Sequence, residues 1–225
     1  MNFALSLRPL RPSPLPIPLP EKLILLVGPI FLAALAAAKA AGAIEMSGGE
    51  LVIVAVRVVV PLIILRFWLV GGIIAMILDM LDVVLIEMVG LGGFGGHYAE
   101  TDKLLDSYYY VLELLVALRW SNRWLRWPAV ILFVQRIIGA VVFEVLHAHA
   151  VLFIFPNLFE NWWLYCVVVM KWFPAITPRN AKTTFLPLAL LLIPKMAQEY
   201  LLHVSEAHPW DWTKHNVLEP LGVQL

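Results

Sequence analysis

Residues 67–91 read FWLVGGIIAMILDMLDVVLIEMVGL, an apolar run that nevertheless carries three carboxylates, at Asp79, Asp82 and Glu87. A membrane-spanning helix needs about 20 mainly apolar residues, and this run is long enough. An ionised side chain at the centre of such a helix costs about 2.5–3.5 kcal/mol on insertion scales, so it usually faces a partner, a cavity or a site. The run therefore predicts a transmembrane helix with a functional polar face.

The whole chain has the composition of an integral membrane protein. Of its 225 residues, 61% are hydrophobic and 14% are charged, whereas about a quarter of the residues of a soluble domain are charged. We expect an all-α, polytopic helical membrane protein with six to seven transmembrane helices in one bundle. The second run gives seven spans if it crosses the membrane and six if it lies at the interface. The hydrophobic runs cover residues 23–44, 50–65, 67–91, 103–119, 127–146, 150–170 and 183–203.

Three regions follow from this pattern. Residues 1–21 contain six prolines and predict an extended surface segment. Residues 22–204 form the transmembrane bundle, and residues 205–225 form a short tail. The sixteen basic and sixteen acidic side chains balance each other, so the net charge gives no indication of a nucleic-acid partner. The expected partner is the lipid bilayer. Basic clusters in the N-terminal segment, in 119–126 and in 171–182 predict a cytoplasmic N-terminus, and we expect the inner membrane of a bacterium.

Two pairs of aspartates suggest a metal site. Asp79 and Asp82 are one helical turn apart, and Asp102 and Asp106 share a face of the next predicted helix, beyond a glycine-rich loop. Two adjacent helices can thus present four carboxylates, enough for one or two Mg²⁺ or Mn²⁺ ions with a substrate phosphate. The alternative is that Asp102 caps the N-terminus of its helix and that Asp106 is exposed.

This pattern resembles the CDP-alcohol phosphatidyltransferase family. The family carries D-x2-D-G-x2-A-R-x8-G-x3-D-x3-D across two neighbouring transmembrane helices, and the chain has D-x2-D at Asp79 and Asp82 and D-x3-D at Asp102 and Asp106. The direct resemblance covers about thirty residues. Upstream, the segment 57–61 is similar to the family's Arg and Pro near its first helix.

The resemblance implies a function and roles for these residues. Asp79, Asp82 and Asp102 would ligate Mg²⁺ or Mn²⁺, and Asp106 would be the general base that deprotonates an alcohol. The alcohol would attack the β-phosphorus of a CDP-linked lipid and expel CMP. The family also implies a homodimer, and a larger membrane complex is the alternative assembly. Candidate substrate-binding cations are Arg57, Lys103 and Arg136.

The chain departs from the family pattern at several positions. Val83 stands where the family has glycine, Ile86 and Glu87 replace Ala-Arg, and the two aspartate pairs are two residues farther apart. The family site opens to the cytoplasm, whereas the distribution of basic residues places the glycine-rich loop outside. A second hypothesis is therefore a catalytically silent relative that acts as a structural or accessory subunit.

Polar residues at two other places compete with the aspartates. Lys195, Glu199 and His203 recur every four residues along the last hydrophobic run, which predicts either a proton or ion path, as in a small transporter, or an internal ion pair of Lys195 with Glu199. Pro156 must break the sixth run, and the polar residues after it, Asn157 among them, either line a cavity or meet water. Tryptophans near the ends of the runs, including Trp120, Trp162 and Trp163, predict interfacial anchors.

Overall fold

A computed structural model gives the fold of residues 19–42, 47–88, 98–148, 150–205 and 212–221. Side chains are described over the same ranges except at 19–25, 82–88, 98–101, 203, 218 and 221. The glycine-rich loop and most of the proline-rich segment therefore lie outside the described residues. Within them the chain is all-helical, without a strand, which confirms the expected all-α class.

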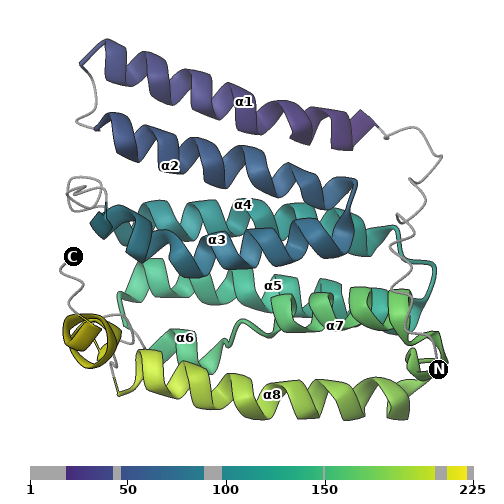
Figure 1. Cartoon of the computed structure of the whole chain (residues 1–225). Helices are drawn as coiled ribbons and strands as arrows, with labels where there is room; N and C mark the ends of the chain where they lie inside the picture. The colour runs from purple at the N-terminus through teal and green to yellow at the C-terminus, as the bar shows by residue number, and fades with distance from the viewer. Residues whose placement is uncertain (1–18, 43–46, 89–97, 149, 206–211, 222–225) are drawn as a thin grey trace.

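The helices lie side by side along the length of the molecule (Figure 1). Their order is α1 (Leu19–Ala40), α2 (Gly48–Val59), η1 (Val60–Leu65), α3 (Trp68–Met88), α4 (Tyr98–Leu118), α5 (Arg123–Leu146), α6 (Ala150–Ile154), α7 (Leu158–Trp172) and α8 (Ala181–His203). Short turns η3 (Pro174–Ile176), η4 (Lys214–Leu218) and η5 (Glu219–Leu221) complete the described chain. Helix α1 begins earlier than expected because Pro20 lies in its first turn, where a missing N–H costs no hydrogen bond.

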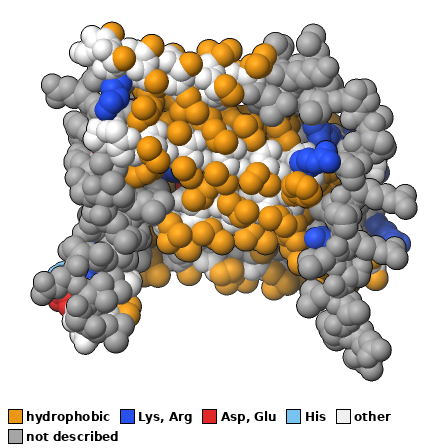
Figure 2. Space-filling model, turned by 45° about the horizontal axis from the view of Figure 1, so that its top comes forward, with side chains coloured by type: hydrophobic (Ala, Val, Ile, Leu, Met, Phe, Trp, Pro, Cys, Tyr) orange, Lys and Arg blue, Asp and Glu red, His pale blue; other side chains and the backbone are white. Residues whose placement is uncertain are grey.

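Among the described residues, four helical stretches are long and apolar enough to cross a membrane: Gly48–Leu65, Arg123–Leu146, Ala150–Trp172 and Ala181–Leu202. The first stretch includes residues 50–65, for which the sequence left open whether they cross the membrane or lie at the interface. Figure 2 shows one face of the molecule, on which hydrophobic side chains form a broad band and Lys and Arg gather at its two ends. This distribution matches a bilayer core between two polar surfaces.

Local sequence explains the shape of the first span. Ser47 and Glu50 form a reciprocal capping box, which fixes the start of α2. Pro61 has no backbone N–H to continue the α-helix, and the chain tightens into the 3₁₀-helix η1. The turn after η1 then brings α3 back against it, so closely that Gly71 faces the backbone of Ile63 and Ile64.

Helix α4 lies at the centre of the packing. It contacts α2, α3, α5, α7 and η1, and its residues Leu112, Val116 and Ala117 are fully buried in the main hydrophobic cluster. The same helix carries five charged residues, including Asp102, Asp106 and Glu113. A helix with that many charges is stable at this position only if its neighbours supply polar partners.

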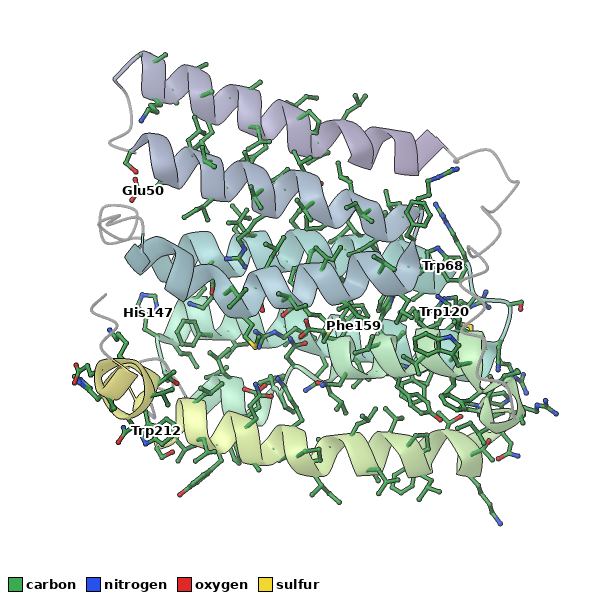
Figure 3. All side chains as sticks on the ribbon, in the orientation of Figure 1. Glu50, Trp68, Trp120, His147, Phe159 and Trp212 are labelled. Carbon is green, nitrogen blue, oxygen red and sulfur yellow. The ribbon has the colours of Figure 1, made fainter. Side chains whose placement is uncertain are left out.

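The tryptophans divide between the core and the ends of the helices. Trp127 and Trp172 are exposed, as an interfacial anchor should be, whereas Trp120, Trp162 and Trp163 are buried. The prediction of an interfacial role is therefore wrong for these three. The indole N–H groups of Trp162 and Trp163 donate to the backbone carbonyls of Leu125 and Glu113, at 3.0 and 2.8 Å, which satisfies them inside the core. Figure 3 shows Trp68 and Trp120 at one end of the helices, Glu50 and His147 at the other, and Phe159 between them.

We expect Gly71→Ala to destabilise the fold. Its added methyl group would overlap the backbone of η1, which cannot move as a side chain can. Overpacking of this kind costs about 1–3 kcal/mol. Thermal unfolding in detergent should show a lower midpoint for this variant, and Gly48→Ala is the matched control because no atom lies within 4 Å of the added methyl group there. Equal midpoints for the two variants would contradict the close packing.

Candidate functional site

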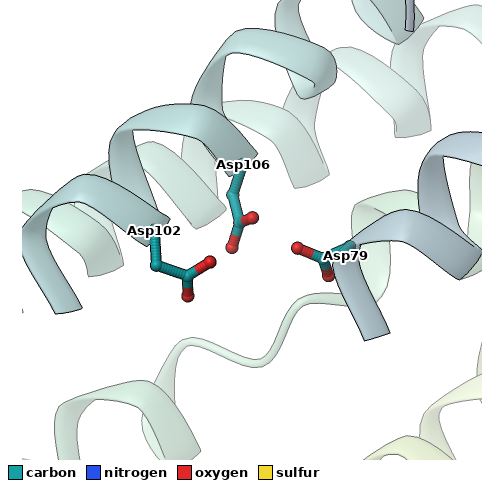
Figure 4. A group of neighbouring side chains, drawn as sticks. All are labelled: Asp79, Asp102 and Asp106. Carbon is teal, nitrogen blue, oxygen red and sulfur yellow. The ribbon is translucent and has the colours of Figure 1, made fainter. Parts of the chain in front are cut away.

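Three of the four predicted aspartates converge on one arginine. Arg57 Nη1 lies 2.6 Å from Asp102 Oδ1, and Arg57 Nη2 lies 2.8 Å from Asp79 Oδ1 and 2.6 Å from Asp106 Oδ1. We call these four side chains the aspartate cluster. They come from three helices: Arg57 from α2, Asp79 from α3, and Asp102 and Asp106 from α4. Figure 4 shows Asp102 and Asp106 pointing from one helix toward Asp79 on the next.

The aspartate cluster lies between the helices, with Arg57 in the last turn of α2 and Asp102 in the second turn of α4. Arg57 and Asp106 are buried, with 6% and 8% of their surface exposed, while Asp79 and Asp102 are half-buried. Since α4 begins at Tyr98, Asp102 lies beyond the first turn. The alternative that Asp102 caps the helix and Asp106 is exposed is therefore wrong. The side chain of Asp82, the fourth predicted ligand, lies outside the described side chains.

The aspartates are close enough together to hold a cation. One ligand oxygen from each of Asp79, Asp102 and Asp106 lies within 4.8 Å of the others. Oxygen ligands of this kind suit hard divalent cations such as Mg²⁺ and Mn²⁺. Within the aspartate cluster, three carboxylates face one guanidinium group, so two negative charges remain to be balanced when all three are ionised. The donor set and its charge therefore fit a divalent cation.

A small cavity adjoins the aspartate cluster on the side of α5. It is lined by Asp106 together with Lys103, Ser107, Tyr110 and Arg136. The ammonium group of Lys103 lies 3.9 Å from the centre of the Phe143 ring, a cation–π contact that holds the side chain beside the cavity. Asp106 thus belongs to the aspartate cluster and also borders the cavity. The two cations that line the cavity, Lys103 and Arg136, favour an anionic group there.

The three predicted substrate-binding cations have different surroundings. Lys103 and Arg136 line the cavity. Arg57 instead contacts the aspartates, and its two terminal nitrogens are engaged in the three ion pairs described above. A guanidinium group presents several N–H donors in one plane, so it can serve three carboxylates at once, which a lysine ammonium on a flexible stem does less well.

A second polar group lies between α4, α7 and α8. Tyr109 OH donates to Glu160 Oε1 at 2.6 Å, and Asn157 Nδ2 donates to Tyr110 OH at 2.6 Å and to Glu160 Oε2 at 3.1 Å. The backbone N–H of Asn157 donates to Glu199 Oε1 at 3.0 Å. We call these five side chains the core network. It joins the cavity through Tyr110, which belongs to both.

The predicted polar stripe of the last helix is present in part. Lys195 and Glu199 form an ion pair at 3.1 Å, and Lys195 also donates to Gln198. Glu199 is buried and points inward to the start of α7, so it belongs to the core rather than to a separate path along α8. The side chain of His203 lies outside the described side chains.

Comparison with known proteins adds no family to this geometry. No protein-family model matches the chain, and no curated protein and no solved structure matches it. The roles of the site residues therefore rest on the chemistry of the site and on the motif resemblance alone.

We expect Arg57→Gln to destabilise the protein strongly. Removing one partner of a buried ion pair leaves uncompensated charge in the interior and costs about 3–5 kcal/mol. Unfolding in detergent, followed by circular dichroism, measures the change. Arg66→Ala is the control, because Arg66 is exposed and surface substitutions usually change stability by within about 0.5 kcal/mol. If both variants unfold like the wild type, Arg57 does not hold the three helices together.

Proposed function

We propose that the chain is a membrane-embedded phosphotransferase of phospholipid synthesis, which moves a phosphatidyl-type group from a CDP-linked donor to an alcohol with a divalent cation. The observation that carries the proposal is the position of Asp106. Its carboxylate belongs to the three-aspartate group and also borders the cavity with Lys103 and Arg136. A base placed between a cation site and a phosphate site suits phosphoryl transfer.

The cation would be held by Asp79 and Asp102, with Asp82 as the further ligand that the sequence suggests. When bound, a divalent cation neutralises the pyrophosphate and stabilises the leaving phosphate. Lys103 and Arg136 would bind the phosphate oxygens from the other side of the cavity. Arg57 would orient the three carboxylates, because its contacts fix all of them at once.

Asp106 would act as the general base. As the oxygen of the alcohol bonds to the β-phosphorus, the phosphoanhydride bond to the CMP oxygen breaks and CMP leaves with that bond's electron pair. The hydroxyl proton of the alcohol passes to the Asp106 carboxylate, which balances the step. The proton would then leave through the cavity that Asp106 borders.

We propose further that six or seven helices cross the membrane in one bundle. Helices α3 and α4 have 21 residues each, or about 30 Å at 1.5 Å per residue, which matches the bilayer core. Both pack against helices that are apolar enough to span, and this supports their inclusion. A cytoplasmic N-terminus, a bacterial inner membrane and a homodimer or larger complex remain part of the proposal.

The enzymatic proposal predicts Mn²⁺-dependent release of CMP from a CDP-linked lipid by the purified protein in mixed micelles. Asp106→Asn should abolish the release, since an amide cannot accept the proton. Loss of a positioned general base typically costs about 10²–10⁴-fold in rate. Glu219→Gln is the control, because Glu219 is exposed on η5 and pairs with His215. Release that is independent of metal, or equal in both variants, would contradict the mechanism.

The second candidate function is a structural or accessory subunit. The observation that favours it is the engagement of all three aspartates by Arg57, which supplies a cation from within the chain. In that case the aspartate cluster joins α2, α3 and α4 and needs no metal. Buried charged groups that specify packing have this role in some proteins.

Binding of Mn²⁺ separates the two candidates. We expect the purified protein to bind Mn²⁺, measured from the loss of the free-ion signal in electron paramagnetic resonance. Asp102→Asn should weaken the binding, because it removes a negative ligand, whereas Glu219→Gln should leave it unchanged. Absence of binding in the wild type would favour the accessory subunit.

A further inference from the structure

The span that contains α6 and α7 is broken after its first five residues. Helix α6 ends at Ile154, Pro156 interrupts the backbone, and α7 starts at Leu158. In Figure 1 the break lies beside the C-terminal part of the neighbouring α8. Asn157 precedes α7, and its backbone N–H is satisfied by the carboxylate of Glu199. The break therefore places polar groups in the buried space between helices, and broken helices of membrane proteins often form binding sites.

Glu113 lies in the same region and has no hydrogen-bond partner. Its side chain is fully buried, at 0% exposure, and neither Oε1 nor Oε2 has a partner among the described residues. The side-chain oxygen of Asn157 is likewise buried and unpartnered within the described chain. When Glu113 is ionised, its two carboxylate oxygens and the Asn157 side-chain oxygen are all hydrogen-bond acceptors without a donor. A proton or a cation would satisfy them.

Glu160 differs from Glu113 in its hydrogen bonds. Both of its carboxylate oxygens accept a hydrogen bond, from Tyr109 and from Asn157, which favours the ionised form. Tyr109, one turn before Glu113 on α4, donates to Glu160, and Trp163, one turn after Glu160 on α7, donates to the backbone carbonyl of Glu113. Glu113 and Glu160 therefore lie on facing turns of α4 and α7. Two nearby buried carboxyl groups rarely both ionise, because each charge repels the other. The hydrogen bonds thus assign the charge to Glu160 and the neutral form to Glu113.

A proton fits this region better than a metal ion. Among the described residues, the only group of three or more ligands close enough for a metal is that of Asp79, Asp102 and Asp106. Glu113 and Glu160 therefore lack a third acidic ligand at metal-binding distance. A proton on Glu113 removes the unfavourable buried charge.

Charged and titratable groups also lie on the elements packed against α4. Helix α4 itself adds two tyrosines of the core network, α2 adds Arg57, α3 adds Asp79, α5 adds Arg136 and α7 adds Glu160. Helix α8 carries Lys195 and Glu199, which pair with each other. Arg57 pairs with the aspartates and Arg136 lines the cavity, and no described group hydrogen-bonds the Glu113 carboxyl group.

We propose that Glu113 and Glu160 form a buried site that binds one proton. Glu113 holds the proton as a carboxylic acid, and Glu160 carries the negative charge, which the hydrogen bonds from Tyr109 and Asn157 stabilise. The proposal is independent of the phosphotransferase activity.

Infrared spectroscopy of the full chain in lipid vesicles tests the site. At neutral pH the wild type should show the carbonyl band of a protonated carboxylic acid. The band should lie at the high-frequency end of the carboxylic-acid range, because the Glu113 carbonyl accepts no hydrogen bond. Glu113→Gln should lose this band, and Glu219→Gln should keep it. Absence of the band in the wild type, or its presence in Glu113→Gln, overturns the proposal.

The assignment is tested in the same sample. Wild type prepared in D₂O should show the band at lower frequency, because the acid proton is replaced by a deuteron, and a band that does not shift overturns the proposal. This measurement needs no variant, so the proposal stays testable even if Glu113→Gln fails to fold.

Discussion

The ion pairs of Arg57 are the contact on which the rest of the structure depends. A single guanidinium group on α2 meets carboxylates of α3 and α4, and these three helices carry most of the acidic side chains of the candidate site. Without Arg57 the aspartates would repel one another in a poorly solvated interior. With it, they are held within reach of one cation and aimed at the same point. The packing of α2, α3 and α4 and the candidate cation site therefore depend on the same ion pairs.

The interior of the protein contains two polar groups that meet at the cavity. The aspartate cluster is held by ion pairs, whereas the core network is held by hydrogen bonds. Lys195 pairs with Glu199 at the edge of the core network. Asp106 and Tyr110 lie one turn apart on α4 and both line the cavity. Proton transfer and phosphate binding, if both occur, would thus use the same helix.

The sequence predicted the all-helical fold and the convergence of Asp79 with Asp102 and Asp106, because apolar runs and helical spacing are local properties. It did not predict that Arg57 would contact the aspartates, since this depends on how α2 turns against α3 and α4. Glu113 was missed altogether, although it lies seven residues after Asp106 and so on a similar face of α4. The sequence placed Trp162 and Trp163 at the interface. It could not predict their burial, because this depends on hydrogen bonds to backbone carbonyls of other helices.

The position of Arg57 also bears on how the protein enters the membrane. Helix α2 is made before its acidic partners, which follow 22, 45 and 49 residues later in the chain. Alone in the bilayer, a central arginine costs about 2.5–3.5 kcal/mol on insertion scales. The cost falls only when α3 and α4 arrive with their carboxylates. In the proposed topology, in which α3 and α4 also cross the membrane, α2, α3 and α4 would therefore have a common energetic reason to leave the translocon as one unit.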